Sequence, residues 1–275
     1  MKRFAVIGDP IAHSLSPRMH AAAYAALGLP HRYEAMKVSD AELPGVIDDL
    51  RAGRLHGCNV TVPHKGAVLA RVDRIAPIAR SFGAANTLVR AADGAIEAHN
   101  TDIPALVAEI AELGHGSWRG ATALVLGSGG AARAAIAALC TLRFGRIVVR
   151  ARSSSAWLAP LRGETPRGTV LEAEGFEAGQ VEATTALVIQ ATSLGLPHTR
   201  GDLAAGAIAW ASLPRSAPVL DLVYGAAPTP FLRAARDAGL RAHDGRGMLA
   251  RQGALAFERW LGIRAPLYTM WSALL

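Results

Sequence analysis

The sequence predicts an α/β protein of two α/β domains, the second of which is a Rossmann-type domain that binds a dinucleotide. Three observations lead to this prediction. Short apolar runs of strand length alternate with helical stretches, which is typical of a mostly parallel sheet covered by helices. The run at residues 121–126 leads directly into a glycine-rich turn and an alanine-rich helix. The 275 residues, of which 51% are hydrophobic, suffice for two domains that each bury a core.

The first domain is expected to begin with a buried strand at residues 3–7, which ends at the turn Gly8-Asp-Pro10. Ser16 is the expected N-cap and Pro17 a first-turn residue of a helix at 18–27, because a serine oxygen can bond free helical N–H groups. Further elements are expected in chain order: a strand at 31–38, a helix from about residue 40, a strand at 57–62, a helix over 67–82 despite Pro77, and a hairpin at 83–100 that turns at Asp93-Gly94.

The Rossmann domain is predicted to span residues 103–245. A closing helix at 248–261 carries apolar residues at helical spacing, and we expect it to pack back on the first domain. Residues 1–102 and 246–275 would then form one discontinuous domain for substrate binding and catalysis. The expected elements of the Rossmann domain are a helix to about residue 113, a strand at 121–126, a helix to about 142, and strands at 146–150, 186–190 and 217–222.

Composition argues against several classes of protein. The formal charge is +7 and the pI about 10.1, but the arginines are scattered without a basic block, so we expect no nucleic-acid partner. No apolar run is long enough to span a bilayer, and the N-terminus does not resemble a signal peptide, which favours a cytoplasmic protein. Cys58 and Cys140 are isolated, and no histidines pair at ligand spacing, so no disulfide or metal site is expected. The expected assembly is a monomer or homodimer.

The glycine-rich turn has the G-x-G-x-x-A form of the dinucleotide fingerprint, in which glycines let the backbone approach a pyrophosphate and the helix N-terminus supplies free N–H groups. The second strand of such a unit usually ends near an acidic residue that binds the NAD ribose, but residues 146–155 contain none. Arginine and serine side chains there suit the 2′-phosphate of NADP(H) instead. The candidate cofactor residues are Gly127, Ser128, Gly129, Gly130, Ala131 and Ala132 in the turn, and Arg150, Arg152 and Ser153 after the second strand.

Lys65 stands out because the chain has 29 basic side chains but only three lysines. An ammonium group can donate and recover a proton at working pH, whereas arginine cannot. Other polar clusters also fall at expected strand ends or loops, where α/β sheets present ligand groups. Together they suit a small polyol that carries an acid group. The clusters are Ser14 and Ser16; Asn59, Thr61 and Lys65; Asn86; Asn100-Thr-Asp102; and Gln252.

Seven motifs follow one another along the chain: Gly8-Asp-Pro-Ile-Ala-His-Ser14-Leu-Ser16-Pro17, Asn59-Val-Thr-Val-Pro-His-Lys65, Gly83-Ala-Ala-Asn86-Thr87, Asn100-Thr-Asp102, Gly127-Ser-Gly-Gly-Ala-Ala132, Asp221-Leu-Val-Tyr224 and Asp244-Gly-Arg-Gly-Met248-Leu-Ala-Arg-Gln252. In the order and spacing of these motifs the chain resembles the shikimate dehydrogenase family over essentially its whole length. The resemblance implies NADP-linked interconversion of 3-dehydroshikimate and shikimate, a step in the biosynthesis of aromatic amino acids.

The resemblance also implies roles for individual residues. Lys65 and Asp102 would be the catalytic pair, with Lys65 as general acid and base. Substrate-binding residues would be Ser14 and Ser16 at the carboxylate, Thr61, Asn86, Asp102 and Gln252 at the hydroxyls, and Asn59 and Tyr224 near the ring. Additional cofactor residues would be Thr192, Leu222, Gly245 and Met248.

The chain departs from the family pattern at two places near the expected cofactor. The usual Asn-Arg-Thr reads Ala151-Arg152-Ser153, which loses an amide, and the usual Asn-Ala-Thr-Ser begins with Gln190, which is one methylene longer. These differences leave alternatives open: a dehydrogenase that acts on quinate or an aminoshikimate, or, in a different class, a non-catalytic sensor of NADP(H).

Overall fold

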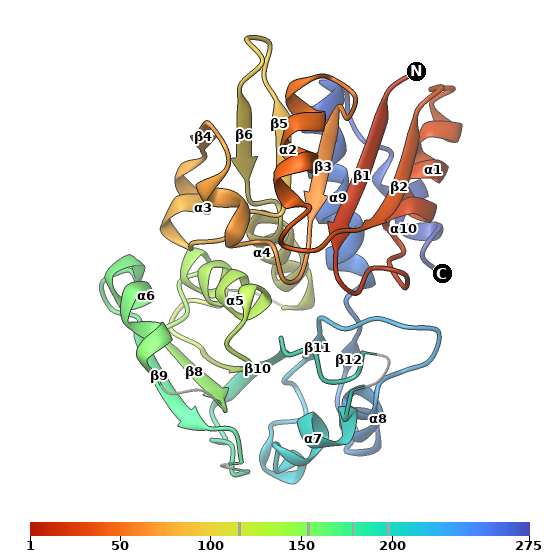
Figure 1. Ribbon diagram of the computed structural model, residues 1–275. Helices are drawn as coiled ribbons and strands as arrows, with labels where there is room; N and C mark the ends of the chain where they lie inside the picture. The colour runs from red at the N-terminus through yellow and green to blue at the C-terminus, as the bar shows by residue number, and fades with distance from the viewer. Residues whose placement is uncertain (115–116, 153–154, 178, 197–198) are drawn as a thin grey trace. The chain divides into compact units, whose positions relative to one another are not determined.

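The computed structural model describes residues 1–114, 117–152, 155–177, 179–196 and 199–275 (Figure 1). The chain separates into two compact units, Met1–Ala105 with Leu249–Leu275, and Leu106–Met248. Both boundaries fall three residues after those expected from the sequence. The assignment of substrate binding to the first unit and of cofactor binding to the second stays a prediction.

Six described strands form the sheet of the first unit, in the order β2-β1-β3-β5-β6-β4. The expected hairpin is present, since β5 and β6 pair antiparallel, while β1 pairs parallel with both β2 and β3. The sheet is therefore mixed. The strands are β1 (Arg3–Gly8), β2 (Arg32–Lys37), β3 (Gly57–Val60), β4 (Arg74–Ile75), β5 (Thr87–Arg90) and β6 (Ile96–His99).

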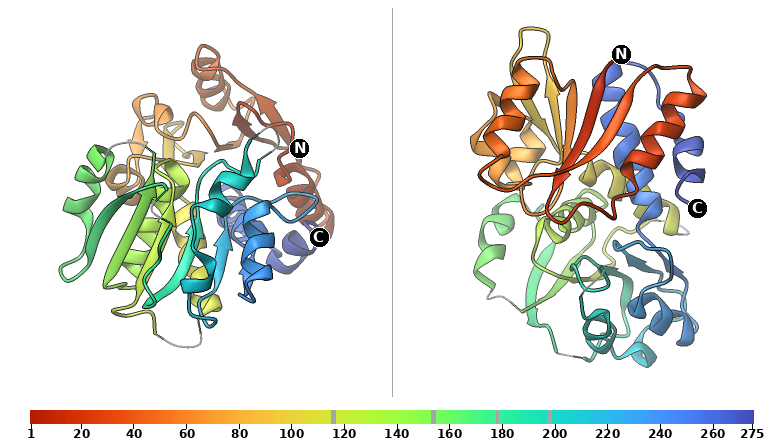
Figure 2. Two further views of the ribbon diagram at one scale, coloured as in Figure 1. Left: turned by 90° about the horizontal axis from the view of Figure 1, so that it is seen from below. Right: turned by 45° about the vertical axis from the view of Figure 1, so that its right-hand side comes forward.

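Helices cover both faces of this sheet (Figures 1 and 2). On one face, Ala5 and Ile7 of β1 pack in a core with Leu43 and Ile47 of α2 (Leu43–Arg51). On the other face, Phe4 stacks on Trp260 of α9 (Arg246–Leu261) with ring centroids 5.0 Å apart. Alternate residues of β1 thus face opposite layers, as the two-residue period of a strand requires. The expected return of the closing helix to the first unit is therefore present.

An aromatic cluster fills the layer between the sheet and helices α1 (Ser16–Ala26) and α9. His20 of α1 is fully buried and stacks on Tyr33 of β2, with centroids 4.1 Å apart. Burial lowers the pKa of His20 to about 3, so this histidine is neutral at physiological pH. Its stacking partner Tyr33 donates its hydroxyl to Asn59 Oδ1 at 2.7 Å, which connects this core to the polar site described below.

Two expected helix boundaries were wrong. Helix α1 begins at Ser16, with Leu15 in the N-cap position, so Ser16 lies inside the first turn with Pro17. The helix expected over 67–82 is broken into the short 3₁₀ turn Ala67–Ala70, strand β4 and helix α3 (Pro77–Ser81). Ala76 adopts an extended conformation because the ring of the following proline clashes with a helical one.

The second unit has a parallel sheet of six described strands in the order β12-β11-β10-β7-β8-β9. Strand order reverses between β7 and β10, as the colours in the left view of Figure 2 show. Such a reversal is the place where doubly wound α/β sheets bind their ligands. The strands are β7 (Thr122–Leu126), β8 (Arg146–Ala151), β9 (Val170–Gly175), β10 (Thr185–Gln190), β11 (Val219–Asp221) and β12 (Ala242–His243).

The helices of the second unit follow the expected pattern near the fingerprint, where α5 (Gly130–Thr141) packs against β7. On one face of the sheet, Leu124 and Val188 share a core with Phe231 of α8 (Pro230–Asp237). Among the described residues, no helix combines the length and apolar character that crossing a membrane requires. The remaining described helices are α4 (Asp102–Leu113), α6 (Ala159–Glu164), α7 (Gly201–Gly206), α10 (Leu267–Ser272) and the 3₁₀ turns Ser155–Leu158 and Trp210–Ser212.

Candidate active site

Lys65 and Asp102 form an ion pair, with Lys65 Nζ 2.6 Å from Asp102 Oδ2. Lys65 follows β3, and Asp102 is the first residue of α4, where the helix dipole favours a carboxylate. The Asn100 side chain fixes this helix start because its Oδ1 accepts from Ile103 N at 3.1 Å. The Asp102 side chain is 6% exposed and that of Lys65 18%, so the ammonium keeps some access to solvent or ligand.

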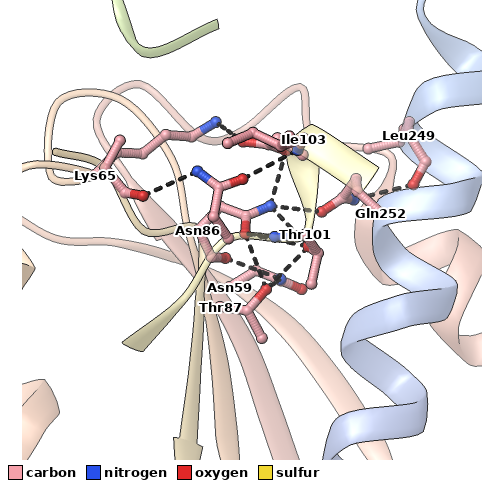
Figure 3. Close-up of polar contacts among 11 residues, drawn as sticks. Asn59, Lys65, Asn86, Thr87, Thr101, Ile103, Leu249 and Gln252 are labelled. Carbon is pink, nitrogen blue, oxygen red and sulfur yellow. Dashed lines mark hydrogen bonds and ion pairs between the residues drawn. The ribbon is translucent and has the colours of Figure 1, made fainter. Parts of the chain in front are cut away.

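Asn86 is the centre of the hydrogen-bond network around this pair (Figure 3). Its Nδ2 lies 2.8 Å from Asp102 Oδ1, 2.9 Å from Thr101 Oγ1 and 3.3 Å from Gln252 Oε1. Its Oδ1 accepts from Thr101 N at 2.7 Å. The two oxygens of Asp102 therefore contact different partners, Asn86 and Lys65, and this fixes the rotation of the carboxylate.

The side-chain amide of Asn59 holds part of this network in place. Its Oδ1 accepts from the hydroxyl of Tyr33, and its Nδ2 donates to Asn86 O at 3.0 Å and Thr87 Oγ1 at 3.1 Å. Asn59 is 5% exposed, and both hydrogens of its amide are used within the protein. The side chain thus holds Asn86 and Thr87 in place, and contact of Asn59 with substrate stays a prediction.

Two threonines belong to this network although the sequence analysis did not select them. Thr87 Oγ1 and Thr101 Oγ1 lie 3.1 Å apart, and each is 3.1 Å from Asn86 Oδ1. Both are essentially fully buried. A threonine next to a selected asparagine or aspartate in a motif is the signal that could have indicated them.

Of the residues predicted to bind the substrate carboxylate, Ser14 lies between β1 and α1 and Ser16 is the first residue of α1, while Thr61, predicted to bind a hydroxyl, directly follows β3. Ser14 Oγ accepts from Ser16 N at 3.3 Å, which joins the two serines at the start of α1. Thr61 lies close to Gly8, where a Cβ atom would come within 2.5 Å of Thr61 Cγ2. Gly8 thus lets the two loops approach each other. Contact of Ser14, Ser16 and Thr61 with a substrate stays a prediction.

The fingerprint turn in the second unit has the geometry that a pyrophosphate needs. Gly127 has φ +121°, and a Cβ there would lie 2.8 Å from Ala191 O, so the position requires glycine. Gly129 precedes the first turn of α5, where free N–H groups can bind an anion. The fully buried Ala132 anchors the helix against the sheet. These residues fit a dinucleotide, although its contacts with Ser128, Gly130 and Ala131 stay predictions.

Arg150 does not have the role predicted for it. Its side chain is 3% exposed, and its guanidinium donates to Glu174 Oε2 at 2.8 Å, to Ala207 O at 2.8 Å and to Gln180 O. These bonds within the protein leave it unavailable to a phosphate. Arg152 is exposed and stays the predicted 2′-phosphate ligand, while Ser153 lies outside the described residues.

The other predicted cofactor residues follow β10 and β11. Thr192 Oγ1 accepts from Leu194 N at 3.0 Å, and a Cβ on Gly245 would lie 2.4 Å from Leu222 O. Gly245 and Leu222 therefore meet backbone to backbone. Tyr224 and Met248 are partly exposed residues of the second unit. Their ligand contacts stay predictions, as does that of Gln252.

Comparison with known proteins agrees with these features. Residues 6–88 match the shikimate dehydrogenase substrate binding domain, and residues 245–275 match the shikimate 5′-dehydrogenase C-terminal domain. The chain is 42% identical to a shikimate dehydrogenase (NADP(+)) of Geobacter sp. strain M21, over 98% of this chain and 93% of the relative.

Two solved structures extend the comparison. Shikimate 5-dehydrogenase from Thermus thermophilus, in complex with NADP(H) and shikimate, is 36% identical with a TM-score of 0.82, over 100% of this chain and 98% of that one. The ligand-free 5-ketofructose reductase of Gluconobacter sp. strain CHM43 is 30% identical with a TM-score of 0.85, over 99% and 97%. The chain belongs to the shikimate dehydrogenase family.

Proposed function

We propose that the protein is an NADP-dependent shikimate dehydrogenase that interconverts 3-dehydroshikimate and shikimate in the biosynthesis of aromatic amino acids. The observation that carries this proposal is the Lys65–Asp102 pair, held by Asn86. It occurs in a chain that is 42% identical to a shikimate dehydrogenase (NADP(+)) and 36% identical to one whose structure contains NADP(H) and shikimate.

NADPH, when bound, supplies the hydride that reduces the ring carbonyl. The carbonyl oxygen then gains negative charge, and a proton donor at that oxygen lowers the energy of the transition state. Lys65 supplies this proton, since its ammonium is partly exposed while the rest of its side chain is held in the protein. In the reverse direction the same nitrogen accepts the proton of the hydroxyl.

Asp102 keeps the ammonium in the position where it can act. Its Oδ2 contacts Lys65 while its Oδ1 is held by Asn86, so neither charged group can turn away without breaking a buried hydrogen bond. We propose that ring hydroxyls bind at the same groups, with Gln252 as a further ligand. Gln252 is restrained for this role because its Nε2 donates to Leu249 O at 3.0 Å.

An absorbance assay of NADPH formation from shikimate and NADP⁺ tests the proposal. NAD⁺ in place of NADP⁺ tests the cofactor preference. Quinate and an aminoshikimate, each in place of shikimate, test the two alternative substrates. 5-Ketofructose with NADPH is a further control, because the Gluconobacter reductase is 30% identical to this chain. Turnover with shikimate and NADP⁺ at the highest kcat/KM supports the proposal, and the absence of turnover with every pairing would favour the non-catalytic sensor.

We further infer that the enzyme works in the cytoplasm as a monomer or homodimer. Both cysteines, Cys58 and Cys140, are buried and free, which suits a reducing compartment. Cell fractionation tests the compartment. Light scattering on the purified protein measures the assembly, and a trimer or larger would contradict the inference.

A further inference from the structure

A buried carboxylate in the second unit connects the two loops that follow β10 and β11. Asp221 is fully buried at the end of β11. Its Oδ1 accepts from Gln190 Nε2 at 3.2 Å and from Val223 N at 3.0 Å, and its Oδ2 accepts from Thr229 Oγ1 at 2.5 Å. All three donors are neutral, and among the residues that the structure describes no cation pairs with this carboxylate. Burying a charged carboxylate costs free energy, and this carboxylate holds Gln190 at the end of β10 and Val223 after β11 in place.

Gln190 transmits the restraint from Asp221 to the segment 191–196, which we call the β10 loop. Besides donating to Asp221, its Nε2 donates to Leu194 O at 2.7 Å, and its Oε1 accepts from Thr192 N at 2.5 Å. Gln190 itself is fully buried. One side chain therefore fixes both the start and the middle of the loop, and the carboxylate fixes that side chain.

The β10 loop lies against the fingerprint turn. A Cβ on Gly127 would come within 2.8 Å of Ala191 O and 3.2 Å of Thr192 Cγ2. Strands β7 and β10 are also neighbours, and Gln190 pairs with Leu126, the residue directly before Gly127. This is the position where strand order reverses, so the β10 loop forms one side of the expected dinucleotide site.

We propose that Gln190, held by the carboxylate of Asp221, is a positioning residue for NADP(H) binding: it fixes the β10 loop against the glycine turn before the cofactor arrives. The inference rests on the proposed NADP(H) dependence. A preformed loop costs the ligand less ordering entropy, so loss of this restraint weakens binding without touching the chemical step.

Gln190→Met is the test variant because methionine has similar length and bulk but none of the three hydrogen bonds to Asp221, Leu194 and Thr192. Thr229→Val is the matched control. It removes the bond to the other oxygen of Asp221 and the cap on Leu232 N, but none of the three hydrogen bonds that Gln190 makes. Both variants lose buried hydrogen bonds of one network, so a merely structural role would affect them alike.

The measurement is the Kd of NADPH for the full-length chain, obtained by fluorescence titration, together with Tm. We expect Gln190→Met to raise Kd about tenfold and Thr229→Val to change it less than about twofold, while both lower Tm. At saturating NADP⁺, kcat of Gln190→Met should stay near the wild-type value. An unchanged Kd for Gln190→Met, or an equal rise for Thr229→Val, overturns the inference.

Amide hydrogen exchange in the wild-type chain without cofactor gives a second test that needs no variant. The Thr192 and Leu194 amides should be protected, because they donate to Gln190 Oε1 and Thr192 Oγ1. Free exchange at both would show that the loop is not held, and it would overturn the inference. A chain that binds NADPH but does not oxidise shikimate would refute the proposed function, while the Kd comparison would still decide the role of Gln190.

Discussion

Two substitutions of Lys65 would show whether the reaction needs the proton of this residue or only its charge. Lys65→Met keeps most of the length of the side chain without its nitrogen. Lys65→Arg keeps the positive charge, but a guanidinium does not release its proton at working pH. General acid–base groups contribute about 10²- to 10⁴-fold in rate, so we expect both variants to lower kcat at least about 10²-fold.

The structure separates this loss from a loss of stability. A fall of about 10²- to 10⁴-fold corresponds to about 2.7–5.5 kcal/mol in activation free energy. Lys65→Met also leaves the carboxylate of Asp102, 6% exposed, without the cation 2.6 Å away. Removing one partner of a buried pair costs about 3–5 kcal/mol, and the 18% exposure of Lys65 places the expected cost near the lower value. Lys65→Arg keeps an ion pair and should cost less, so its loss of activity would not come from unfolding.

The assay is the initial rate of NADPH formation at saturating NADP⁺, with urea unfolding of each variant measured in parallel. Lys37→Met is the control, since Lys37 is 74% exposed and its Nζ is 3.5 Å from Asp9. The KM for shikimate should change less than about threefold, because other predicted ligands remain. A Lys65→Arg variant that keeps more than about a tenth of kcat would refute proton transfer by Lys65, and near-normal activity of Lys65→Met would refute the catalytic assignment.

Three further predictions test the support of the site and the second unit. Asn86→Leu removes the donor to Asp102 Oδ1, so it should lower kcat about tenfold and the free energy of unfolding by about 2 kcal/mol. Initial rates and urea unfolding measure the two effects, and an unchanged kcat would contradict this. Arg152→Ala should raise the KM of NADP⁺ about tenfold and leave the KM of NAD⁺ unchanged. Arg150→Ala should mainly lower the free energy of unfolding, by about 2–3 kcal/mol, because Arg150 bonds groups inside the protein. The opposite pattern would show that Arg150, and not Arg152, binds the 2′-phosphate. Burial raises the pKa of Asp221 to about 6. Below the ordinary pKa of an aspartate, the carboxyl is protonated in both the folded and the unfolded chain, so its burial does not depend on pH. As pH rises from there through 6, ionisation favours the unfolded chain, and the free energy of unfolding falls. Asp221→Asn carries no charge at this position. From about pH 4 to pH 8 the free energy of unfolding of the wild type, measured in urea, should therefore fall by up to about 3 kcal/mol relative to that of the variant. The same change with pH in both proteins would contradict this.

Local patterns in the sequence were sufficient for the elements around the glycine turn and for the hairpin of the first unit, whereas β9, β12 and helices α6, α7 and α8 were not predicted. The strand, glycine turn and helix around Gly127 are adjacent in the chain, and each is specified by its own residues, so β7 and α5 were predicted within a few residues. The same is true of the turn at Asp93-Gly94 between β5 and β6. The prediction over 67–82 was wrong because its helical period was given more weight than the backbone restriction before Pro77.

For the site, the sequence by itself determined which chemical groups are available, and the fold decided which of them are free to act. Lys65, Asn86 and Asp102 could be predicted because functional side chains of α/β proteins follow their strands. The surroundings of Arg150 could not be predicted in this way. Its partners come from distant segments, such as Ala207, which is 57 residues away. Only tertiary packing brings a donor and an acceptor together across such a separation, and it leaves the Arg150 side chain 3% exposed and bonded inside the second unit.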